Sequence, residues 1–345
     1  MFSYAIERFN LEINDLRSYA VTNRSVRALL KNAESLLEPS ILEDTVSNLK
    51  ILAPSDTRWR VLEHSLIVSR LYAIYESFCE ALLGDWITFL SNTRTYSKLP
   101  KKITENYPYG LANILGMLPS PRYPALNVKE LISGYHAALE GNNDYSISPQ
   151  CLIHHKNNLR WGDLLEILGK CAIEDFSGWV VGSQDLLGYL SSGTERVIDR
   201  LSAKLEVFIQ YRNDSSHGII EVDEILGHDE QLELIEFVSA LCRTLDNCVR
   251  WKMIQSQVDL GNAHFLGRIS EVFPKANAAI LVGNKAKLKV GQKIHVRKES
   301  NLYEDTFYSL QIDGFGTHEI LTTNGTEVGI RLEKLPAKGS FLYSL

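Results

Sequence analysis

The sequence predicts a two-domain protein, in which a mainly α-helical domain over residues 1–258 precedes a small all-β barrel over residues 262–345. Two observations support this division. Apolar residues recur at three-and-four spacing in the first region, which is typical of amphipathic helices. After Gly261 the chain instead shows short alternating runs separated by Gly, Asn and Pro, which are typical of strands. The 345 residues are enough for two hydrophobic cores.

Amphipathic helices account for most of the first region. The widest apolar stripe, which includes an aromatic series from Tyr72 to Trp86, runs from Val61 to Leu90 and predicts a core helix. The segment 98–126 is rich in Pro, Gly and Tyr and is expected to be a loop-rich insertion. Further helices are expected over residues 2–37, with a break near Thr22-Asn23, and over residues 127–139, 157–168, 192–211 and 228–258.

Six β-rich runs follow Gly261, among them KLKVGQKIHVR and DTFYSLQID. Six short strands in so short a segment predict a closed barrel, because closure leaves no exposed strand edge. The tail also carries 11 Lys and Arg against 8 Asp and Glu over residues 262–345, whereas the whole chain has 36 against 42. A basic tail on an acidic body places any general attraction for nucleic acid in the tail.

Composition excludes several classes of protein. No apolar stretch is long enough for a transmembrane helix. Acidic residues in the first turns argue against a secretory signal, and five cysteines without a CxxC pair argue for a reducing, cytoplasmic location and against a metal site. The adjacent His154 and His155 would point about 100° apart on a helix, and a loop or cap role is expected for them rather than metal binding.

The stretch FIQYRNDSSHGII, residues 208–220, places Arg212 and His217 around four small polar residues. Because such residues compete for local backbone groups, the preceding helix is expected to end at Tyr211. In an unbroken helix Arg212 and His217 would lie about 140° apart around the axis. Either a distortion or a second copy of the chain must therefore bring them together on one anion, unless the stretch is an ordinary solvated helix end. A second Arg and His pair of similar spacing, Arg58 and His64, lies at a helix entrance and is interpreted as accidental.

YRNDSSHG resembles the signature of the HEPN superfamily of metal-independent ribonucleases and their inactive relatives. Two further stretches, SRLYAIYESFCEALL and HHKNNLRWGDLLEILG, are similar to the RiboL-PSP type of HEPN domain, and the likeness spans about residues 10–255. The resemblance implies cleavage of RNA by attack of the ribose 2′-hydroxyl, without a metal or another cofactor. It also implies a homodimer with the active site shared between the two copies.

Three residues take the catalytic roles in this interpretation. His217 would act as general acid or base near neutral pH, and Arg212 would hold the phosphate oxygens. Asn213 would position the phosphate or the imidazole. Supporting roles are open for Asp214 and Ser216, which are equally suited to capping, and for Glu76, which either orients Arg212 or His217 or pairs with Arg70.

A second set of residues forms the candidate RNA-binding surface. Asn157 and Asn158 are expected beside the active site. On the tail, the cations can face RNA only if strand alternation puts them on one side. The alternative for them is an ordinary soluble surface. The tail residues in this set are Lys285, Lys287, Lys289, Lys293 and Arg297.

The tail is similar to the second-domain β-barrel of elongation factor Tu, chiefly in LKVGQKI and GTEVGIRL. That resemblance implies a docking module for tRNA, another RNA or a component of translation. A phosphate-binding GxxxxGK[ST] loop is absent from the sequence, so GTP hydrolysis is not implied.

Two functions follow from the sequence. The first is a single-strand-cleaving RNA endonuclease of the toxin or antiviral host-defence (abortive infection) type, held in check by an antitoxin or another regulatory partner. The second is a non-catalytic HEPN scaffold that dimerises and binds RNA or protein. The acidic body favours the second, and the Arg212-to-His217 motif favours the first.

Overall fold

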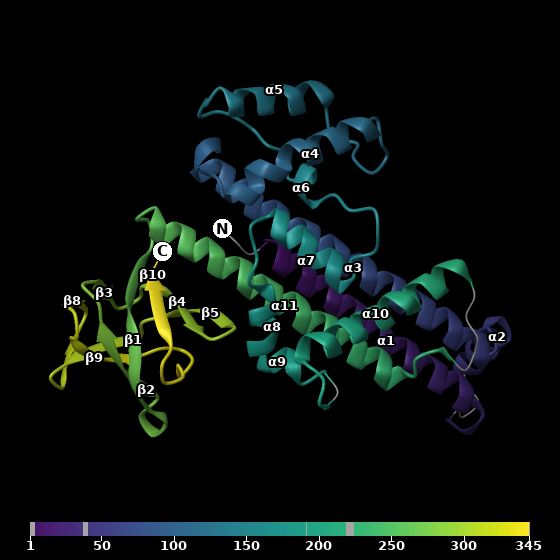
Figure 1. The fold of residues 1–345 in the computed structure, drawn as a ribbon. Helices are drawn as coiled ribbons and strands as arrows, with labels where there is room; N and C mark the ends of the chain where they lie inside the picture. Colours follow the sequence, from purple (N-terminus) through teal and green to yellow (C-terminus); the bar gives the residue numbers. More distant parts are fainter. Residues whose placement is uncertain (1–3, 37–40, 191, 219–223, 345) are drawn as a thin grey trace. The chain divides into compact units, whose positions relative to one another are not determined.

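The computed structural model describes residues 4–36, 41–190, 192–218 and 224–344 (Figure 1). A helical region followed by a β-rich region confirms the predicted fold class. The chain divides into two compact units, Met1–Glu174 with Gln184–Arg243, and Asp175–Ser183 with Thr244–Leu345. Helix α11 (His228–Asp259) belongs to the first unit up to Arg243 and to the second from Thr244. The unit boundary therefore precedes the change of residue pattern near residues 257–263.

The first unit is built from helices around one long central helix, α3. Helix α3 packs against α1 on one side and α10 on another. Its buried stripe includes Tyr75 and Phe78, whose rings contact Phe208 of α10 and Phe9 of α1 with centroids 6.4 and 4.7 Å apart. The helices are α1 (Tyr4–Leu36), α2 (Ile41–Leu52), α3 (Asp56–Thr93), α4 (Lys101–Met117), α5 (Val128–Leu139), α6 (Gln150–Ile153), α7 (Trp161–Lys170), α9 (Gln184–Leu187) and α10 (Val197–His217), with a 3₁₀ turn η1 (Tyr96–Lys98).

Helix α4 corrects the predicted loop over residues 98–126. Proline and glycine in this stretch suggested turns, yet the chain is helical through Pro108. The buried residues Ile103, Tyr107, Leu111 and Ile114 follow three-and-four spacing. Burying four large apolar side chains contributes more than the roughly 3 kcal/mol that an internal proline costs. The apolar spacing was present in the sequence, but the proline obscured it.

The expected break in α1 near Thr22-Asn23 is also wrong, since the helix is continuous from Tyr4 to Leu36. The Asn23 side-chain oxygen accepts a hydrogen bond from the Trp59 indole at 3.0 Å. That contact with α3 uses the polar group that would otherwise compete with the helical backbone. Tertiary packing therefore overrides the weak helix propensity of these two residues.

The second unit contains short strands, helix α8 (Phe176–Gly182) and the end of α11. Eight strands form one sheet in the order β5-β4-β10-β1-β2-β9-β6-β7, and β3 pairs with β8 as a separate ribbon. The strands are β1 (His264–Phe273), β2 (Ala278–Gly283), β3 (Lys287–Lys289), β4 (Lys293–Lys298), β5 (Asn301–Thr306), β6 (Ser309–Ile312), β7 (Phe315–Thr317), β8 (Glu319–Leu321), β9 (Glu327–Arg331) and β10 (Phe341–Ser344).

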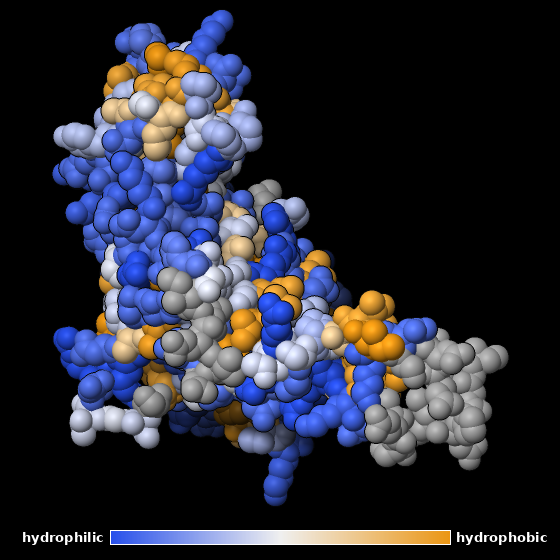
Figure 2. Space-filling view, turned by 90° about the vertical axis from the view of Figure 1, so that its right-hand side faces the viewer, coloured by the Kyte–Doolittle hydropathy of each residue, from blue (hydrophilic) through white to orange (hydrophobic). Residues whose placement is uncertain are grey.

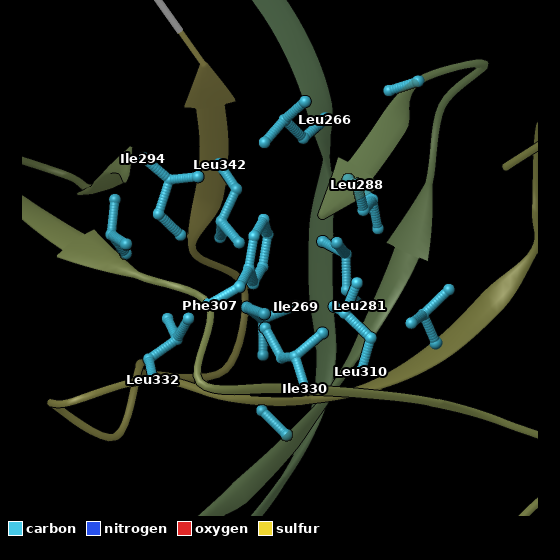
Figure 3. Packing of buried hydrophobic residues seen from close by; sticks show 14 residues of the cluster. Leu266, Ile269, Leu281, Leu288, Ile294, Phe307, Leu310, Ile330, Leu332 and Leu342 are labelled. Carbon is cyan, nitrogen blue, oxygen red and sulfur yellow. The ribbon is translucent and has the colours of Figure 1, made fainter. Parts of the chain in front are cut away.

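The predicted closed barrel is wrong, because β5 and β7 lie at opposite ends of the sheet order and pair only with β4 and β6 among the described strands. Both end strands belong to hairpins, β4–β5 and β6–β7, and their outer edges have no partner among the described strands. The inner residues still enclose one apolar core (Figure 3). Its members include Leu266, Leu281, Phe307, Ile330 and Leu342.

The last turns of α11 pack on this sheet within the second unit. The ring of Trp251 lies 5.1 Å from that of Tyr343 on β10. The guanidinium of Arg297 on β4 lies 4.1 Å from the centroid of Trp251 and 5.4 Å from that of Trp179 on α8. Arg297 therefore stacks on indole rings in the second unit. Within the ranges that the structure describes, no helix is long and apolar enough to cross a membrane.

Candidate functional site

The Arg-to-His motif forms the last turns of helix α10. The helix continues past Tyr211 and ends only at His217. Gly218 then adopts a left-handed conformation, with φ of 69°, and its N–H donates to the carbonyl of Asp214. Glycine suits this position because it has no Cβ. The expectation that the helix stops at Tyr211 is therefore wrong, and a local distortion does not bring Arg212 and His217 together.

Two of the small polar residues of the motif form side-chain hydrogen bonds within the helix itself. The Gln210 amide donates to Asp214 at 2.7 Å, one turn along the helix. The Ser216 hydroxyl donates to the carbonyl of Arg212 at 2.9 Å. Asp214 and Ser216 thus lie inside α10, and the helix end is formed by Gly218 rather than by either of them.

Arg212 is half-buried and rests on an aromatic ring of α3. Its guanidinium carbon lies 4.9 Å from the ring centroid of Tyr72. It also donates a hydrogen bond to the Asn213 side-chain oxygen at 3.2 Å, and the same oxygen accepts from the Asn158 amide at 2.8 Å. The loop between α6 and α7 is therefore tied directly to the motif through Asn158.

Tyr72 links Arg212 to the carboxylate of Glu76. Its hydroxyl donates to Glu76 Oε1 at 3.2 Å and accepts the Leu159 N–H at 3.0 Å. Burial raises the pKa of Tyr72, so the phenol is neutral and can donate. Tyr72 therefore connects Glu76, which accepts a hydrogen bond from its hydroxyl, with Arg212, which lies over its ring. Arg70, the alternative partner expected for Glu76, instead pairs with Glu12 at 3.4 Å.

A buried histidine closes the network on the other side of Glu76. His155 Nδ1 donates to the Asn157 carbonyl at 2.7 Å, and Nε2 lies 3.2 Å from Glu80 and 3.6 Å from Glu76. Burial lowers the pKa of His155, but the hydrogen bonds to Glu80 and Asn157 and the charge of Glu76 outweigh burial and raise it. The arrangement favours a protonated imidazolium. Arg122 completes the cluster with a 3.0 Å bond to Glu80.

The structure joins some of the predicted site residues and separates others. Arg212, Asn213, Asn158 and, through Tyr72, Glu76 form one network. His217 is exposed at the end of α10, about 140° around the helix from Arg212. Asn157 is exposed and gives its carbonyl to His155.

Sequence reasoning missed four members of the network, namely Tyr72, Glu80, Arg122 and His155. Tyr72 was assigned to the core and His155 to a loop or cap role. A signal was present for two of them, because Tyr72, Glu76 and Glu80 are spaced by four residues and share one face of α3. Arg122 and His155 come from separate loops, which only the fold brings together.

The other Arg and His pair does not form a site. Arg58 is exposed, whereas His64 is buried. His64 Nδ1 accepts the Leu226 N–H at 3.2 Å, and the ring contacts Tyr211 edge-on at 5.4 Å. Burial lowers the pKa of His64, which is consistent with a neutral imidazole in a packing role.

The predicted RNA-facing cations occupy different settings in the second unit. Lys285, Lys287 and Lys289 are exposed, but only Lys287 and Lys289 belong to β3, where they share one side of the strand. Lys285 precedes β3 and has a left-handed backbone, with φ of 38°. Lys293 is exposed on β4, and Arg297 stacks on Trp251. Among the described residues, no group of three or more His, Cys, Asp or Glu side chains is arranged to hold a metal ion.

Comparison with known proteins relates most of the chain to one family. The model of the RiboL-PSP-HEPN family matches residues 28–250. The matched segment begins within α1 and ends within α11, so it includes α3, the loop between α6 and α7, and all of α10. No curated protein matches the chain. Every residue of the network around Arg212 lies inside the matched segment.

Proposed function

Because the chain belongs to the RiboL-PSP-HEPN family, we propose that it is a metal-independent endoribonuclease whose active site is assembled by a homodimer. HEPN domains are typically ribonucleases or nucleotide-binding modules, and they typically bind RNA and dimerise. The observation that carries the proposal is the continuity of α10 through Arg212 and His217. A continuous helix keeps the two side chains apart in one copy, so a shared phosphate requires the second.

The chemistry needs only a proton carrier and a fixed cation. One imidazole of His217 takes the proton of the ribose 2′-hydroxyl while the 2′-oxygen forms a bond to phosphorus. The bond from phosphorus to the 5′-oxygen breaks, and that oxygen takes a proton from a solvent water while the imidazolium releases its proton to solvent. Proton removal by a positioned imidazole contributes roughly 10²- to 10⁴-fold to the rate. The product pair is a 2′,3′-cyclic phosphate and a 5′-hydroxyl.

Arg212 supplies the electrostatic part of the reaction. A guanidinium presents donors in a fixed plane that matches two phosphate oxygens, and it stays charged at any working pH. The Tyr72 ring and the Asn213 side chain fix its orientation before RNA binds. A pre-oriented cation stabilises the developing charge without reorganising during the reaction.

Exposed apolar residues on the motif-bearing helices support association with a second copy. Leu62 and Leu66 of α3 are 60% and 46% exposed, and Val207 of α10 is 50% exposed. Figure 2 shows a face that is largely hydrophilic with separate hydrophobic patches. Burial of such side chains in a two-fold interface contributes favourably, and the symmetry would bring two copies of the motif together.

Cleavage of total cellular RNA in the presence of EDTA tests the proposed activity. The wild-type protein should cut the RNA, and Arg212→Ala and His217→Ala should each abolish cutting. Arg58→Ala and His136→Ala remove a residue of the same type outside the motif and should leave cutting intact. Cleavage that survives in both motif variants would point to another site or to a contaminating nuclease.

The proposed biological role of this ribonuclease is that of a toxin or a host-defence protein. Expression of the wild-type chain should arrest growth, and Arg212→Ala or His217→Ala should relieve the arrest. The proposed target is RNA of the translation apparatus, including tRNA. Cleavage in single-stranded regions is favoured because in-line attack requires a bent phosphate backbone. Normal growth at wild-type protein levels would argue against this role.

A non-catalytic scaffold is the second candidate, and the charge of the body favours it. Residues 1–261 carry 25 Lys and Arg against 34 Asp and Glu, obtained by subtracting the tail's 11 and 8 from the chain's 36 and 42. An acidic body attracts RNA poorly. Intact RNA under all conditions, together with a stable dimer, is the result expected of a scaffold.

A further inference from the structure

A basic cleft lies in the second unit, formed around the ribbon of β3 and β8. Its volume is about 790 Å³, which is within the usual range for ligand-binding clefts. Strand β3 and the turn that follows it form one wall, and the start of β1 forms another. The polar residues that line the cleft are Asn262, His264, Lys285, Lys287, Lys289, Gln292 and Ser344.

Three lysines line the cleft in a row along the chain, Lys287 and Lys289 on β3 and Lys285 in the bend before it. Lys285, Lys287 and Lys289 are exposed, while the intervening Ala286 and Leu288 are buried. Alternate residues of a strand lie about 6.6 Å apart on one side. The buried Leu288 therefore fixes the spacing and direction of Lys287 and Lys289, and a ligand with charges repeated along its length fits the row better than a single free anion.

The positive charge of this row is only partly neutralised. Lys287 pairs with Glu319 of β8 at 2.8 Å. Within the described ranges, no ion pair joins Lys285 or Lys289 to a carboxylate, and no acidic residue is among those that line the cleft. The cleft therefore carries a net positive charge, although the whole chain is acidic.

The residues that line the cleft also show what kind of contact it makes. None of the described lining residues is Phe, Trp or Tyr, and the imidazole of His264 is the single aromatic ring among them. Lysine donors recognise phosphate without reading base sequence. A concave site with donors along one wall suits a flexible strand that bends into it, rather than the convex surface of a duplex.

We propose that this cleft binds the phosphate backbone of single-stranded RNA, independently of base sequence. The inference rests on the proposed function, because it makes the cleft an anchor for the RNA that the helical unit cuts. It narrows the predicted surface to Lys285, Lys287 and Lys289 with their polar neighbours. Lys293 lies outside the cleft lining, and Arg297 stacks on Trp251.

Fluorescence anisotropy with the full chain tests the cleft separately from cleavage. The probe is a labelled 2′-O-methyl oligouridine of about 12 nucleotides, which lacks the attacking hydroxyl and spans a typical single-strand site. The triple variant Lys285→Gln/Lys287→Gln/Lys289→Gln should bind it about tenfold more weakly or worse. Its dependence on salt should also become shallower, by about 0.7 in log–log slope for each phosphate that the variant no longer neutralises.

A second triple variant, Lys275→Gln/Lys293→Gln/Lys338→Gln, removes the same charge from exposed positions of the second unit outside the cleft. It should bind within about twofold of wild type, since distant exposed charges are screened by salt. Equal weakening by the two triple variants would show that total charge, and not the cleft, governs binding, and would overturn the proposal.

Glu319→Gln gives a test of opposite sign. Removing this carboxylate frees Lys287 and should tighten binding of the oligouridine by a few-fold. A duplex of the same length should bind more weakly than the single strand, and polyglutamate at equal charge should compete poorly. Stronger binding of either competitor would assign the cleft to a duplex or to an acidic protein instead.

The cleft and the nuclease can fail independently in these experiments. Lysine-dependent binding by a protein that leaves total RNA intact would support the cleft and reject the proposed nuclease. Chelator-resistant cleavage that requires Arg212 and His217, combined with unchanged binding by the Lys285/Lys287/Lys289 variant, would support the nuclease and reject the cleft.

Discussion

The guanidinium of Arg212 lies 4.9 Å above the ring of Tyr72, and the Tyr72 hydroxyl is held between Glu76 and the Leu159 N–H. The cation that defines the motif on α10 is thus positioned by a residue of α3. A cation over an aromatic ring contributes about 0.5–2 kcal/mol, depending on its exposure to water. Orientation of Arg212 therefore depends on packing between two helices far apart in the sequence.

Substitutions of Tyr72 should separate the ring from the hydroxyl. Tyr72→Phe keeps the ring beneath Arg212 but leaves the buried Leu159 N–H unpaired, which should cost about 1–3 kcal/mol of unfolding free energy. RNA cleavage, measured at a temperature where this variant is fully folded, should stay near wild type. Tyr72→Leu removes the ring and should lower kcat/KM about tenfold or more, which corresponds to the upper range of such a contact. Equal loss of kcat/KM in both variants would show that the hydroxyl matters as much as the ring.

Asn158 and Asn157 form a matched pair of neighbouring side chains. Asn158→Ala removes the hydrogen bond to Asn213 and should lower kcat/KM by roughly 2- to 10-fold, as expected for one hydrogen bond. Asn157→Ala removes an exposed side chain and keeps the carbonyl that His155 uses, so its kcat/KM should match wild type. The reverse order of effects would mean that Asn157 contacts RNA directly.

Mixed dimers should recover activity from two inactive variants. If each site takes Arg212 from one copy and His217 from the other, a dimer of Arg212→Ala with His217→Ala contains one intact site. Random exchange makes about half of the dimers mixed, so about a quarter of the wild-type cleavage rate is expected. The measurement is RNA cleavage after unfolding and refolding the two variants together. Refolded mixtures as inactive as their parents would place both residues in a single-copy site.

The stability contributed by His155 should fall as the pH rises. Its pKa is raised in the folded protein, so the imidazolium interactions with Glu80 and Glu76 are fully present below the unfolded value and are lost above the folded one. His155→Asn should therefore reduce the free energy of unfolding more at about pH 6 than at about pH 9. Urea denaturation at the two pH values measures this difference. Burial lowers the pKa of His64 and His295, which gives the opposite pH dependence, but those two histidines are common to both proteins and cancel. The pKa of His154 is lowered by burial and also by the charges of Arg122 and His155, so its contribution changes with the substitution. A penalty that is the same at both pH values would mean a neutral His155.

The order of helical and β-rich regions was predictable because apolar spacing reflects burial on one face. The core helix over residues 61–90 was recognised for this reason, and it extends from Asp56 to Thr93. Helix α4 was missed because Pro108 carries a strong local signal against helix, whereas the burial that overrides it is a tertiary effect. Closure of the sheet depends on which strands pair at its ends, and strand periodicity alone does not determine that pairing.

The candidate site was predictable in its motif but not in its surroundings. Arg212, His217 and Asn158 were identified from local sequence. The four-residue spacing of Tyr72, Glu76 and Glu80 is also visible in the sequence, but it was attributed to core packing. The sequence contains no signal that His155 and Arg122 lie close together, because their contact depends on two loops that converge on α3. His64, whose pairing with Arg58 is interpreted from the sequence as accidental, is buried and bonded to Leu226, so His64→Ala would test stability rather than chemistry.

Helix α11 passes from one compact unit into the other at Arg243 and Thr244, and Trp251 near its end packs against Tyr343 and Arg297. Gene rearrangements that transplant the β-rich region intact must therefore carry the second half of this helix as well. A recombination junction at Gly261, where the sequence pattern changes, would leave Tyr343 and Arg297 without the Trp251 ring that packs against them. The segment Asp175–Ser183, which belongs to the same unit and carries the Trp179 ring beneath Arg297, would have to be transferred with the β-rich region.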